Sequence, residues 1–385
     1  MTSEWRTIRA ADFIDFNPRL SLKKGDIATK VAMDKLKPFT KKIPETEKAE
    51  FNGGAKFCNG DTVMARITPC LENGKTAYVD MLDDGEIGFG STEFIVMRAK
   101  TGISDPQFVY YTAINPVFRN VAIKSMVGSS GRQRVQQSVL EELELSVPDL
   151  EEQRRIGAFL ARIDEKIALN DRINDNLQQQ ASILYGKYFP YAVTDDLPAG
   201  WRVGTVGEIV EIHDSKRIPL SGAQRAKMEK RIYPYYGAAS LMDYVDEYIF
   251  DGKYLLLGED GTVVDDAGYP ILQYVWGQFW VNNHAHILTG KLGFNVESLL
   301  LLFKRTPVKS IVTGAVQPKI SQANLRSIQV VVPPQHELDA FNELIRPLFD
   351  QIRQNQDQNK ALTSLRDSLL PKLMSGEIDV SDIQL

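Results

Sequence analysis

The sequence predicts an α+β fold that is built twice: two mixed α/β globular parts, each followed by a long helix. Three observations lead to this prediction. Short motifs recur in the same order in the two halves of the 385-residue chain. Two long segments carry apolar residues at heptad spacing. The remaining stretches mix strand-like and helix-like runs separated by turn residues. Together they predict an internal pseudo-twofold repeat.

The duplication is seen as a constant offset of 185 residues between matching motifs. Residues 140–148 (LEELELSVP) align with residues 325–333 (LRSIQVVVP), and both show the alternation of a half-buried strand that ends at proline. Upstream, the small-residue loop 127–135 aligns with the loop 312–320. Because the matches keep their order along the chain, we interpret them as a duplication.

Both halves also open alike, with Trp5-Arg6 in the first and Trp201-Arg202 in the second, at an offset of 196 residues. The first globular part therefore carries about 11 extra residues, which we assign to loops. We expect four segments in this order: a first globular domain (1–148), a first long spacer helix (149–190), a second globular domain (191–333), and a second long spacer helix with the C-terminal tail (334–385).

The two helical patterns share one heptad register. Asparagine interrupts the apolar seam at matching positions, which costs stability but fixes register and partner choice. We expect the helices to pair so that these asparagines meet near the middle. The expected helix-pair interface consists of Leu160, Ile163, Ile167, Asn170, Asn174, Leu177 and Leu184 in the first helix, and Ile345, Leu348, Ile352, Asn355, Asn359, Leu362 and Leu369 in the second.

The ends of these helices carry their own signals. Asp149 precedes Glu152 by three residues, as in a capping box, so the first helix is expected to start just after Pro148. A run of about 36 helical residues would be about 54 Å long. Pro347 is expected to kink the second helix or to mark its start.

Within the globular parts, alternation and turn residues predict several elements. Expected strands lie at residues 61–67, 75–80, 93–98, 254–257 and 280–288, and expected helices at 105–120 and 295–304.

The net charge of −5 is unusual for a chain that binds duplex DNA, because phosphate contacts come from lysine and arginine. The acidic excess lies mostly in the C-terminal tail. Two segments are locally basic: residues 1–42, and residues 216–231, which hold six basic side chains and one acidic side chain. Charge alone is therefore compatible with nucleic-acid binding but does not establish it.

Motifs for catalysis are incomplete. Asn73-Gly74-Lys75-Thr76 ends like a phosphate-binding loop, but Pro69 stands where its first glycine belongs. Asn115-Pro116-Val117-Phe118 lacks the second proline of the loop with which amino-methyltransferases hold their target. His284 and His286 alternate on an expected strand, but no further metal ligand follows at useful spacing. We expect no catalytic residue and no metal site.

The sequence also carries few signals of cellular location. No apolar run is long enough to span a membrane, and the N-terminus lacks the layout of a signal peptide. Cys58 and Cys70 are too few for a disulfide framework, so we expect two reduced thiols and a cytoplasmic protein.

Taken together, the motifs of this chain resemble the specificity subunits of type I restriction–modification systems, and the resemblance covers essentially the whole chain. The matching pieces are residues 68–75 (TPCLENGK), 129–135 (SSGRQRV), 148–156 (PDLEEQRRI), 197–201 (LPAGW), 317–320 (QPKI) and 373–378 (LMSGEI).

The resemblance implies two target-recognition domains that each read half of a split sequence in double-stranded DNA. It implies that the long helices form an antiparallel coiled coil, separate the domains and dock two methyltransferase subunits. Separate restriction and translocation subunits would complete the assembly. S-adenosylmethionine and ATP would bind those partners, so this chain is expected to be a non-catalytic subunit without a cofactor.

Basic and amide side chains near the motifs are the candidate DNA contacts, because they can reach phosphates and base edges. They are Lys23, Lys24, Arg132, Gln133 and Arg134 in the first half, and Lys216, Arg217, Gln317 and Lys319 in the second. Two alternatives stay open from the sequence: an assembly scaffold whose domains bind protein, and an enzyme with a degenerate methyltransferase site.

Overall fold

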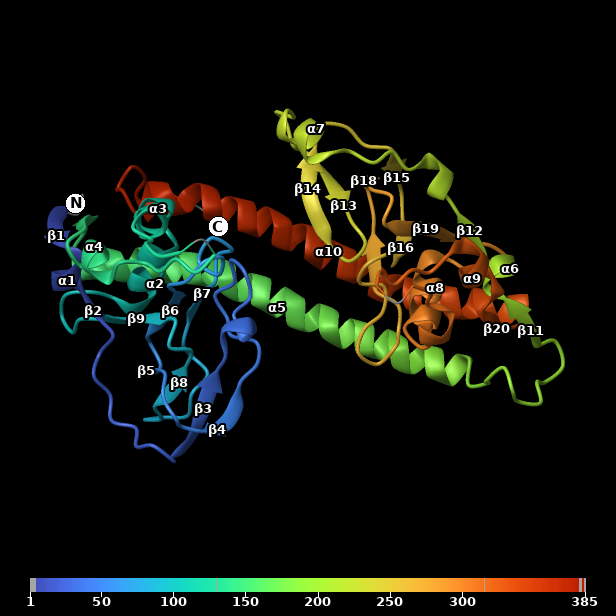
Figure 1. Cartoon of the computed structure of the whole chain (residues 1–385), viewed down its shortest axis with the longest axis horizontal. Coiled ribbons are helices and arrows are strands. Elements are labelled where there is room, and N and C mark those ends of the chain that lie inside the picture. Colours follow the sequence, from blue (N-terminus) through green and yellow to red (C-terminus); the bar gives the residue numbers. More distant parts are fainter. Residues whose placement is uncertain (1–4, 130, 315, 381–382, 384–385) are drawn as a thin grey trace. The chain divides into compact units, whose positions relative to one another are not determined.

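The computed structural model describes residues 5–129, 131–314, 316–380 and 383. The chain forms two compact units. The first unit joins the residues up to Arg172 with those from Asn355 onward, and the second unit is Ile173–Gln354. Two long helices, α5 (Leu150–Tyr188) and α10 (Gln335–Leu373), each contribute to both units. Figure 1 shows α5 in green and α10 in red.

The first unit combines short strands with short helices ahead of α5. Its strands are β1 (Arg6–Arg9), β2 (Ile14–Phe16), β3 (Ile27–Val31), β4 (Glu47–Glu50), β5 (Ala55–Phe57), β6 (Thr62–Ala65), β7 (Thr76–Tyr78), β8 (Gly88–Gly90), β9 (Phe94–Ala99) and β10 (Glu144–Val147). Its helices ahead of α5 are α1 (Ala10–Phe13), the 3-10 turn η1 (Met33–Lys35), α2 (Pro106–Ile114), α3 (Pro116–Lys124) and α4 (Gln137–Glu141).

The second unit repeats this mixture ahead of α10. Its strands are β11 (Arg202–Thr205), β12 (Val210–Ile212), β13 (Tyr233–Tyr236), β14 (Leu241–Val245), β15 (Phe250–Asp251), β16 (Tyr254–Gly258), β17 (Leu272–Val275), β18 (Gln278–Val281), β19 (Ala285–Gly290) and β20 (Gln329–Val332). Its helices are α6 (Val206–Ile209), η2 (Asp214–Lys216), α7 (Gly222–Ala226), α8 (Val296–Phe303), η3 (Lys309–Ile311) and α9 (Gln322–Ser327).

Strand topology is the same in both units. In the first unit the sheets have the orders β1-β10, β2-β9-β6-β7 and β4-β3-β8-β5. In the second unit the orders are β11-β20, β12-β19-β16-β17 and β14-β13-β18-β15, so each strand has its counterpart ten strands later. Even the parallel pair within each sheet, β3 with β8 and β13 with β18, is repeated. The predicted α+β class and internal repeat are confirmed.

Each unit buries apolar residues of its globular part against the long helices. In the first unit, Phe108 of α2 belongs to the same buried cluster as Leu160 of α5 and Leu373 of α10. In the second unit, Leu299 of α8 shares a cluster with Ala181 of α5 and Phe341 of α10. Apolar area removed from water stabilises by roughly 25 cal/mol per Å². The seam of each long helix therefore faces the globular part as well as the other helix.

Two predicted elements are split in the structure. The helix expected at 105–120 is two helices, because the side chain of Asn115 accepts a hydrogen bond from the backbone of Val117 and caps α3, whose first residue is Pro116. The strand expected at 280–288 is β18 and β19, separated by residues 282–284. In both places the apolar pattern predicted one continuous element, and a local capping or turn preference divides it into two.

The start of α5 agrees with its sequence signal, since Asp149 accepts a hydrogen bond of 2.9 Å from the backbone of Glu152. The prediction that Pro347 marks a helix start is wrong. α10 begins at Gln335, and Pro347 lies within it with an exposed side chain. Upstream of Pro347, Leu338, Phe341 and Ile345 are buried in the core, so tertiary burial extends the helix past the proline.

Of the helices in the described ranges, none combines the length and the hydrophobicity that crossing a membrane would require. Cys58 and Cys70 are both free and half-buried.

A buried polar chain links three parts of the first unit. Lys41 is 6% exposed and lies 4.9 to 5.4 Å from the ring centres of three tyrosines. Its ammonium donates to the Tyr111 hydroxyl at 3.2 Å, and Tyr111 donates to Asp164 of α5 at 2.6 Å. Arg366 of α10 closes the chain with a 2.6 Å hydrogen bond to the same carboxylate. The globular part and both helices therefore meet at one carboxylate.

Burial lowers the pKa of Lys41 from its ordinary value of 10.5 to about 8, although the charge of Asp164 opposes the shift. Between these two pH values the unfolded chain binds more protons at this position than the folded chain, so stability rises with pH. We predict that the free energy of unfolding of the wild type rises by up to about 3 kcal/mol between pH 7 and pH 10.5 because of this lysine, and that Lys41→Met removes this rise. Urea unfolding of both proteins at several pH values measures the difference.

Lys42 offers the matched control, because it is exposed and paired with Asp80 at the surface. Lys42→Met should follow the wild-type pH profile. A Lys41→Met profile that runs parallel to wild type over this range would show that the buried ammonium is not the source of the gain.

Candidate nucleic-acid interface

A loop of matching geometry lies in each unit: the first loop (residues 127–135) and the second loop (residues 312–320). In the first loop, Val127 and Arg134 exchange two backbone hydrogen bonds of 2.9 and 3.0 Å. In the second loop Thr313 and Lys319 exchange two such bonds of 2.8 and 2.9 Å, with Thr313 one residue beyond the counterpart of Val127. Each loop thus closes on itself at its base.

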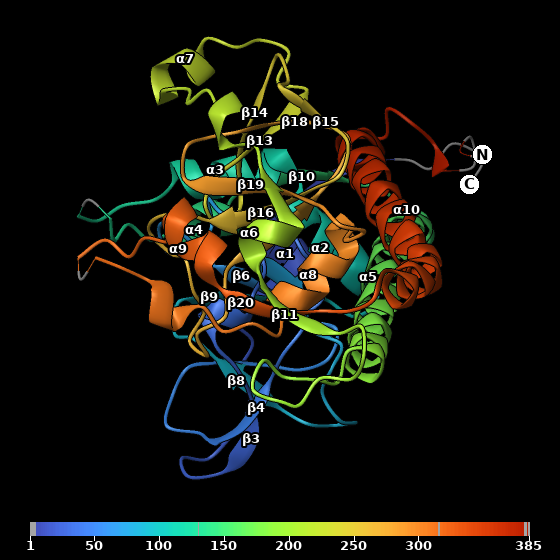
Figure 2. The ribbon, with the colours of Figure 1, turned by 90° about the vertical axis from the view of Figure 1, so that its right-hand side faces the viewer.

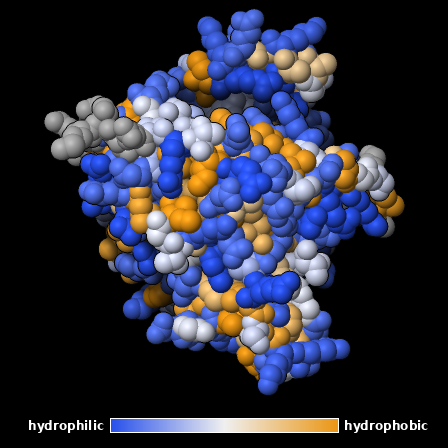
Figure 3. Space-filling view, turned by 90° about the vertical axis from the view of Figure 1, so that its left-hand side faces the viewer, coloured by the Kyte–Doolittle hydropathy of each residue, from blue (hydrophilic) through white to orange (hydrophobic). Residues whose placement is uncertain are grey.

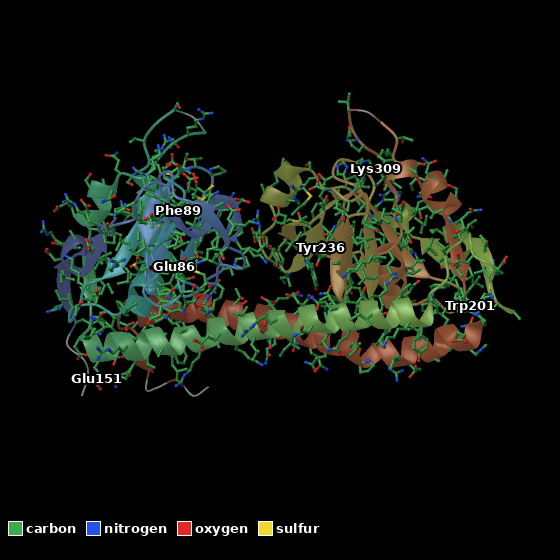
Figure 4. The ribbon with its side chains drawn as sticks, turned by 90° about the horizontal axis from the view of Figure 1, so that it is seen from below. Glu86, Phe89, Glu151, Trp201, Tyr236 and Lys309 are labelled. Atoms are coloured by element: carbon green, nitrogen blue, oxygen red, sulfur yellow. The ribbon has the colours of Figure 1, made fainter. Side chains whose placement is uncertain are left out.

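The same strand end anchors both loops. In the first unit the backbone of Val135 donates to the Arg66 carbonyl at 2.8 Å, just beyond β6. In the second unit Ile320 donates to the Glu259 carbonyl at 2.8 Å, just beyond β16. In Figure 4 each loop projects from the side of its unit opposite the long helices; in the second unit it follows the labelled Lys309. The repeat therefore provides each unit with one projecting, anchored loop.

Several predicted DNA contacts are exposed cations. Lys23 and Lys24 lie in the connection from β2 to β3, Arg132 in the first loop, and Lys216 at the end of η2. Within the described residues, none of these four side chains forms an ion pair. Gln317 of the second loop is exposed too, while Gln133 is half-buried and its backbone carbonyl accepts a hydrogen bond from Thr68. These exposed groups are free to meet a ligand.

The other three predicted contacts are held by carboxylates. Arg134 forms a forked interaction with Glu93 at 2.6 to 3.0 Å, which lowers the pKa of that carboxyl. Arg217 lies 2.5 Å from Glu259, and Lys319 lies 3.2 Å from the same carboxylate. The sequence did not suggest these partners, since they lie far away along the chain. Their geometry assigns Arg134, Arg217 and Lys319 to bracing the loops.

The prediction that His284 and His286 alternate on one strand is wrong, because only His286 lies in a strand. His284 precedes β19 and interacts with Asp260, whereas His286 lies in β19 and is fully buried. Around His286 the fold gathers Asp214 and Glu259, whose oxygens lie within 4.8 Å of its ring nitrogen and of each other. Sequence spacing could not reveal this cluster, because the three residues come from distant segments.

The spacing of this cluster would suit a metal ion, but its charge is already balanced. Arg217 is 2.5 Å from Glu259 and 3.5 Å from Asp214, and Lys319 adds a second cation. A divalent ion would have to displace these cations from their carboxylates. We therefore interpret the cluster as an ion-pair network.

The long helices run antiparallel within each unit. In the first unit, Asp164 of α5 contacts Arg366 of α10, and six residues later Asn170 contacts Asn359. As the residue numbers rise along α5, the numbers of the residues that they contact on α10 fall, as in an antiparallel pair. In the second unit the ring of Tyr185 packs on Phe341, 5.5 Å between centres. Figure 2 shows the two helices side by side in end-on view.

Asparagines of the predicted seam form hydrogen bonds between the two long helices. Asn170, fully buried, donates to Asn359 and to Gln358, each at 2.8 Å. Asn359 in turn donates to Asp171 at 2.8 Å. Asn174 of the second unit donates to the Ile352 carbonyl at 3.4 Å. Paired amides of this kind fix helix register, because a shifted register leaves buried amide groups unpaired.

The remaining predicted seam positions are buried or partly buried. In the first unit Leu160, Ile163 and Asn355 are buried, and Ile167, Leu362 and Leu369 pack against the core. In the second unit Ile345 and Ile352 are buried, and Leu177, Leu184 and Leu348 pack against the core. The ion pair between Asp164 and Arg366, both 6% exposed as side chains, was not foreseen.

Figure 3, which views the left-hand end of Figure 1, shows mainly hydrophilic side chains with hydrophobic groups scattered among them.

The family model described as "Type I restriction modification DNA specificity domain" matches this chain twice, over residues 3–179 and 198–363. The chain belongs to this family. Each match contains one globular part with its loop, together with most of the long helix that follows. Membership in this DNA specificity family thus agrees with the repeat found in the strand order.

Relatives within the family extend this likeness. The type I restriction enzyme MjaIX specificity subunit of Methanocaldococcus jannaschii is 24% identical over 293 residues, 68% of this chain and 66% of its own length. The EcoAI specificity subunit of Escherichia coli is 31% identical over 156 residues, 39% of this chain and 26% of its own. This chain thus spans less than two thirds of either relative. The M. jannaschii MjaVIII specificity subunit is 20% identical to this chain, and the match covers 99% of this chain and 94% of that subunit.

A solved structure has the same fold. The type I restriction–modification system S subunit from M. genitalium superposes with a TM-score of 0.56 and 18% identity, covering 96% of each chain. This likeness concerns the fold.

Asn170 and Asn359 give a direct test of the seam. Replacing either by alanine should destabilise the chain by about 1–3 kcal/mol, because the other amide loses a buried partner. In a double-mutant cycle the pair should couple by about 0.5–3 kcal/mol. Urea unfolding of the wild type, the single variants and the double variant provides the coupling energy. Asn176→Ala, at an exposed position of α5, serves as the control; strictly additive effects of the seam variants would contradict the pairing.

Proposed function

We propose that this chain is the DNA specificity subunit of a type I restriction–modification complex. Each globular part reads one half of a split target in double-stranded DNA, and the paired helices connect the two readers. One observation carries this proposal: a single topology occurs twice, each time with a projecting loop anchored at the same strand end. Duplicated readers on one chain suit a target with two separated halves.

The chemistry of the loops supports DNA as the ligand. Arg132, Lys23 and Lys24 of the first unit and Lys216 of the second are exposed cations that can reach phosphates, which set register on the duplex. Arginine pairs with guanine and glutamine with adenine at the base edges, so Arg132 and Gln317 are the candidate readers. The braced cations Arg134, Arg217 and Lys319 hold the loops in shape.

Partner subunits complete the function we propose. The net charge of −5 leaves part of the phosphate grip to other chains. Two methyltransferase subunits dock on the long helices, and restriction and translocation subunits join them. S-adenosylmethionine and ATP bind those partners, and this chain acts without catalysis, in the cytoplasm.

A protein-binding scaffold is the second candidate. The near-neutral charge favours it, as do the exposed apolar side chains of Leu241, Met242 and Tyr244 on β14. Selection of DNA targets distinguishes the two functions, because a scaffold would retain no sequence preference.

We predict that the chain, purified with the modification subunit of its own system, enriches random duplexes that share two fixed blocks with an unconstrained gap. Sequencing of the retained duplexes gives both blocks and the gap length. Retention without any shared sequence would favour the scaffold and refute the proposal.

Arg132→Ala provides a variant within this experiment, with Lys166→Ala on the exposed face of α5 as its control. Loss of one base contact should cost about 1–3 kcal/mol of discrimination in one block only. Lys166→Ala should leave both blocks as they are.

The proposed role of the helices predicts a change in the gap. Seven residues inserted after Arg172 in α5 and after Gln354 in α10 fall at the unit boundaries and preserve the heptad register. They add about 10.5 Å of helix, or about three base pairs at 3.4 Å each. Mapping the methylated adenines should show a gap longer by about three base pairs; an unchanged gap with intact methylation would exclude the helices as the spacer.

A further inference from the structure

His286 occupies a position that the proposed function does not use. It lies in β19 with no exposed surface, and both of its ring nitrogens have partners. Nδ1 is 2.6 Å from a carboxylate oxygen of Asp214. Nε2 is 2.8 Å from the backbone carbonyl of Ile320, the last residue of the second loop. The imidazole therefore bridges η2 and the base of the loop.

Both partners of the ring are acceptors. The Ile320 carbonyl has no proton to give. Burial tends to raise the pKa of Asp214, but hydrogen bonds from His286 and the Ile287 backbone lower it below its ordinary value, so the carboxylate is ionised. Its oxygens also accept from Ile287 at 3.0 Å and Gln322 at 2.6 Å. The two bonds of His286 form together only when both ring nitrogens carry a proton.

Charged groups of both signs surround the ring. Besides Asp214, the carboxylate of Glu259 lies 3.8 Å from Nδ1. Two cations share these carboxylates: Arg217 lies 2.5 Å from Glu259 and 3.5 Å from Asp214, and Lys319 lies 3.2 Å from Glu259. Arg217 also donates to the Ala285 carbonyl at 2.8 Å. The network therefore joins η2, β19, the end of β16 and the second loop through charge-assisted hydrogen bonds, which are stronger than neutral ones.

The first unit has no such bridge. In the strand register, His286 opposes Leu257 on β16, and the equivalent pair on β9 and β6 is Ile95 with Met64. Ile95 is fully buried and apolar, so the base of the first loop receives no hydrogen bond from that position. Its brace is the surface pair of Arg134 with Glu93, 2.6 Å apart. The two loops are thus positioned by different physical means.

We propose that His286, donating from one ring nitrogen to Asp214 and from the other to the carbonyl of Ile320, is a positioning residue that fixes the second loop for reading its half of the target. The proposal rests on the proposed function. Recognition of only one half of the target, the half that the second unit reads, should depend on this contact, because the first loop has no such imidazole. His286 touches no DNA; it acts through the carbonyl of Ile320 and the path of the loop that ends there.

The first test needs no DNA. The chain contains four histidines, so selective ¹⁵N labelling of histidine gives a spectrum simple enough to assign with single His→Gln variants. At neutral pH both ring nitrogens of His286 should show the shifts of protonated nitrogen. A neutral ring with one bare nitrogen would overturn the proposal, whether or not the chain recognises DNA.

The second test uses the full chain with its modification subunit and the target found by enrichment. His286→Ile places the first unit's residue in the second unit. It should reduce discrimination in one block by about tenfold or more, through the loss of a buried charged hydrogen bond, and leave the other block unchanged. His286→Gln keeps a donor for the Ile320 carbonyl and should restore part of the discrimination.

His213→Gln is the matched control, since the His213 ring bonds to Thr289 in the same unit and, among the described residues, forms no hydrogen bond with the second loop. Equal loss in both blocks for His286→Ile, or no loss in either, would refute the positioning role. If the wild-type complex enriches no split target, the proposed function fails, while the labelling experiment still decides the state of His286.

Discussion

The antiparallel packing of α5 against α10 is the interaction on which the structure depends. The core of the first unit closes only when Leu370 and Leu373, near the end of α10, pack against residues of the first globular part. The second unit likewise needs Tyr185 of α5 beside Phe341 of α10. Each unit therefore takes residues from distant parts of the chain, so neither globular part has its complete core without the helices.

Buried polar groups make this packing specific. Asp164 receives hydrogen bonds from Tyr111 and Arg366, which ties the globular part, α5 and α10 to one carboxylate. In the second unit Glu297 of α8 is bonded to Tyr274 of β17 and Arg353 of α10, which ties the globular part to α10. A buried ion pair adds little net stability but penalises every arrangement that separates it. The asparagines of the seam act in the same way on helix register.

The features that differ between the two units are expected to give each unit its own target sequence. The shared scaffold repeats strand order and loop anchoring, whereas the connection before β13 is longer than that before β3 and carries the basic segment 216–231. The loop braces also differ: a surface pair of Arg134 with Glu93 in one unit, and the buried network around His286 in the other. A duplicated fold with diverged loops can read two unrelated sequences from one chain.

The sequence by itself determined the duplication, the two heptad helices and the start of α5, because these depend on local spacing and on residue types such as Asn170 and Asp149. It missed the break at Asn115 and the course of α10 past Pro347, where capping or burial overrides the local pattern. Only the tertiary structure decided which cations are free and which are braced. Arg134, Arg217 and Lys319 look like DNA contacts in sequence, yet their carboxylate partners lie 41, 42 and 60 residues away and meet them only after folding.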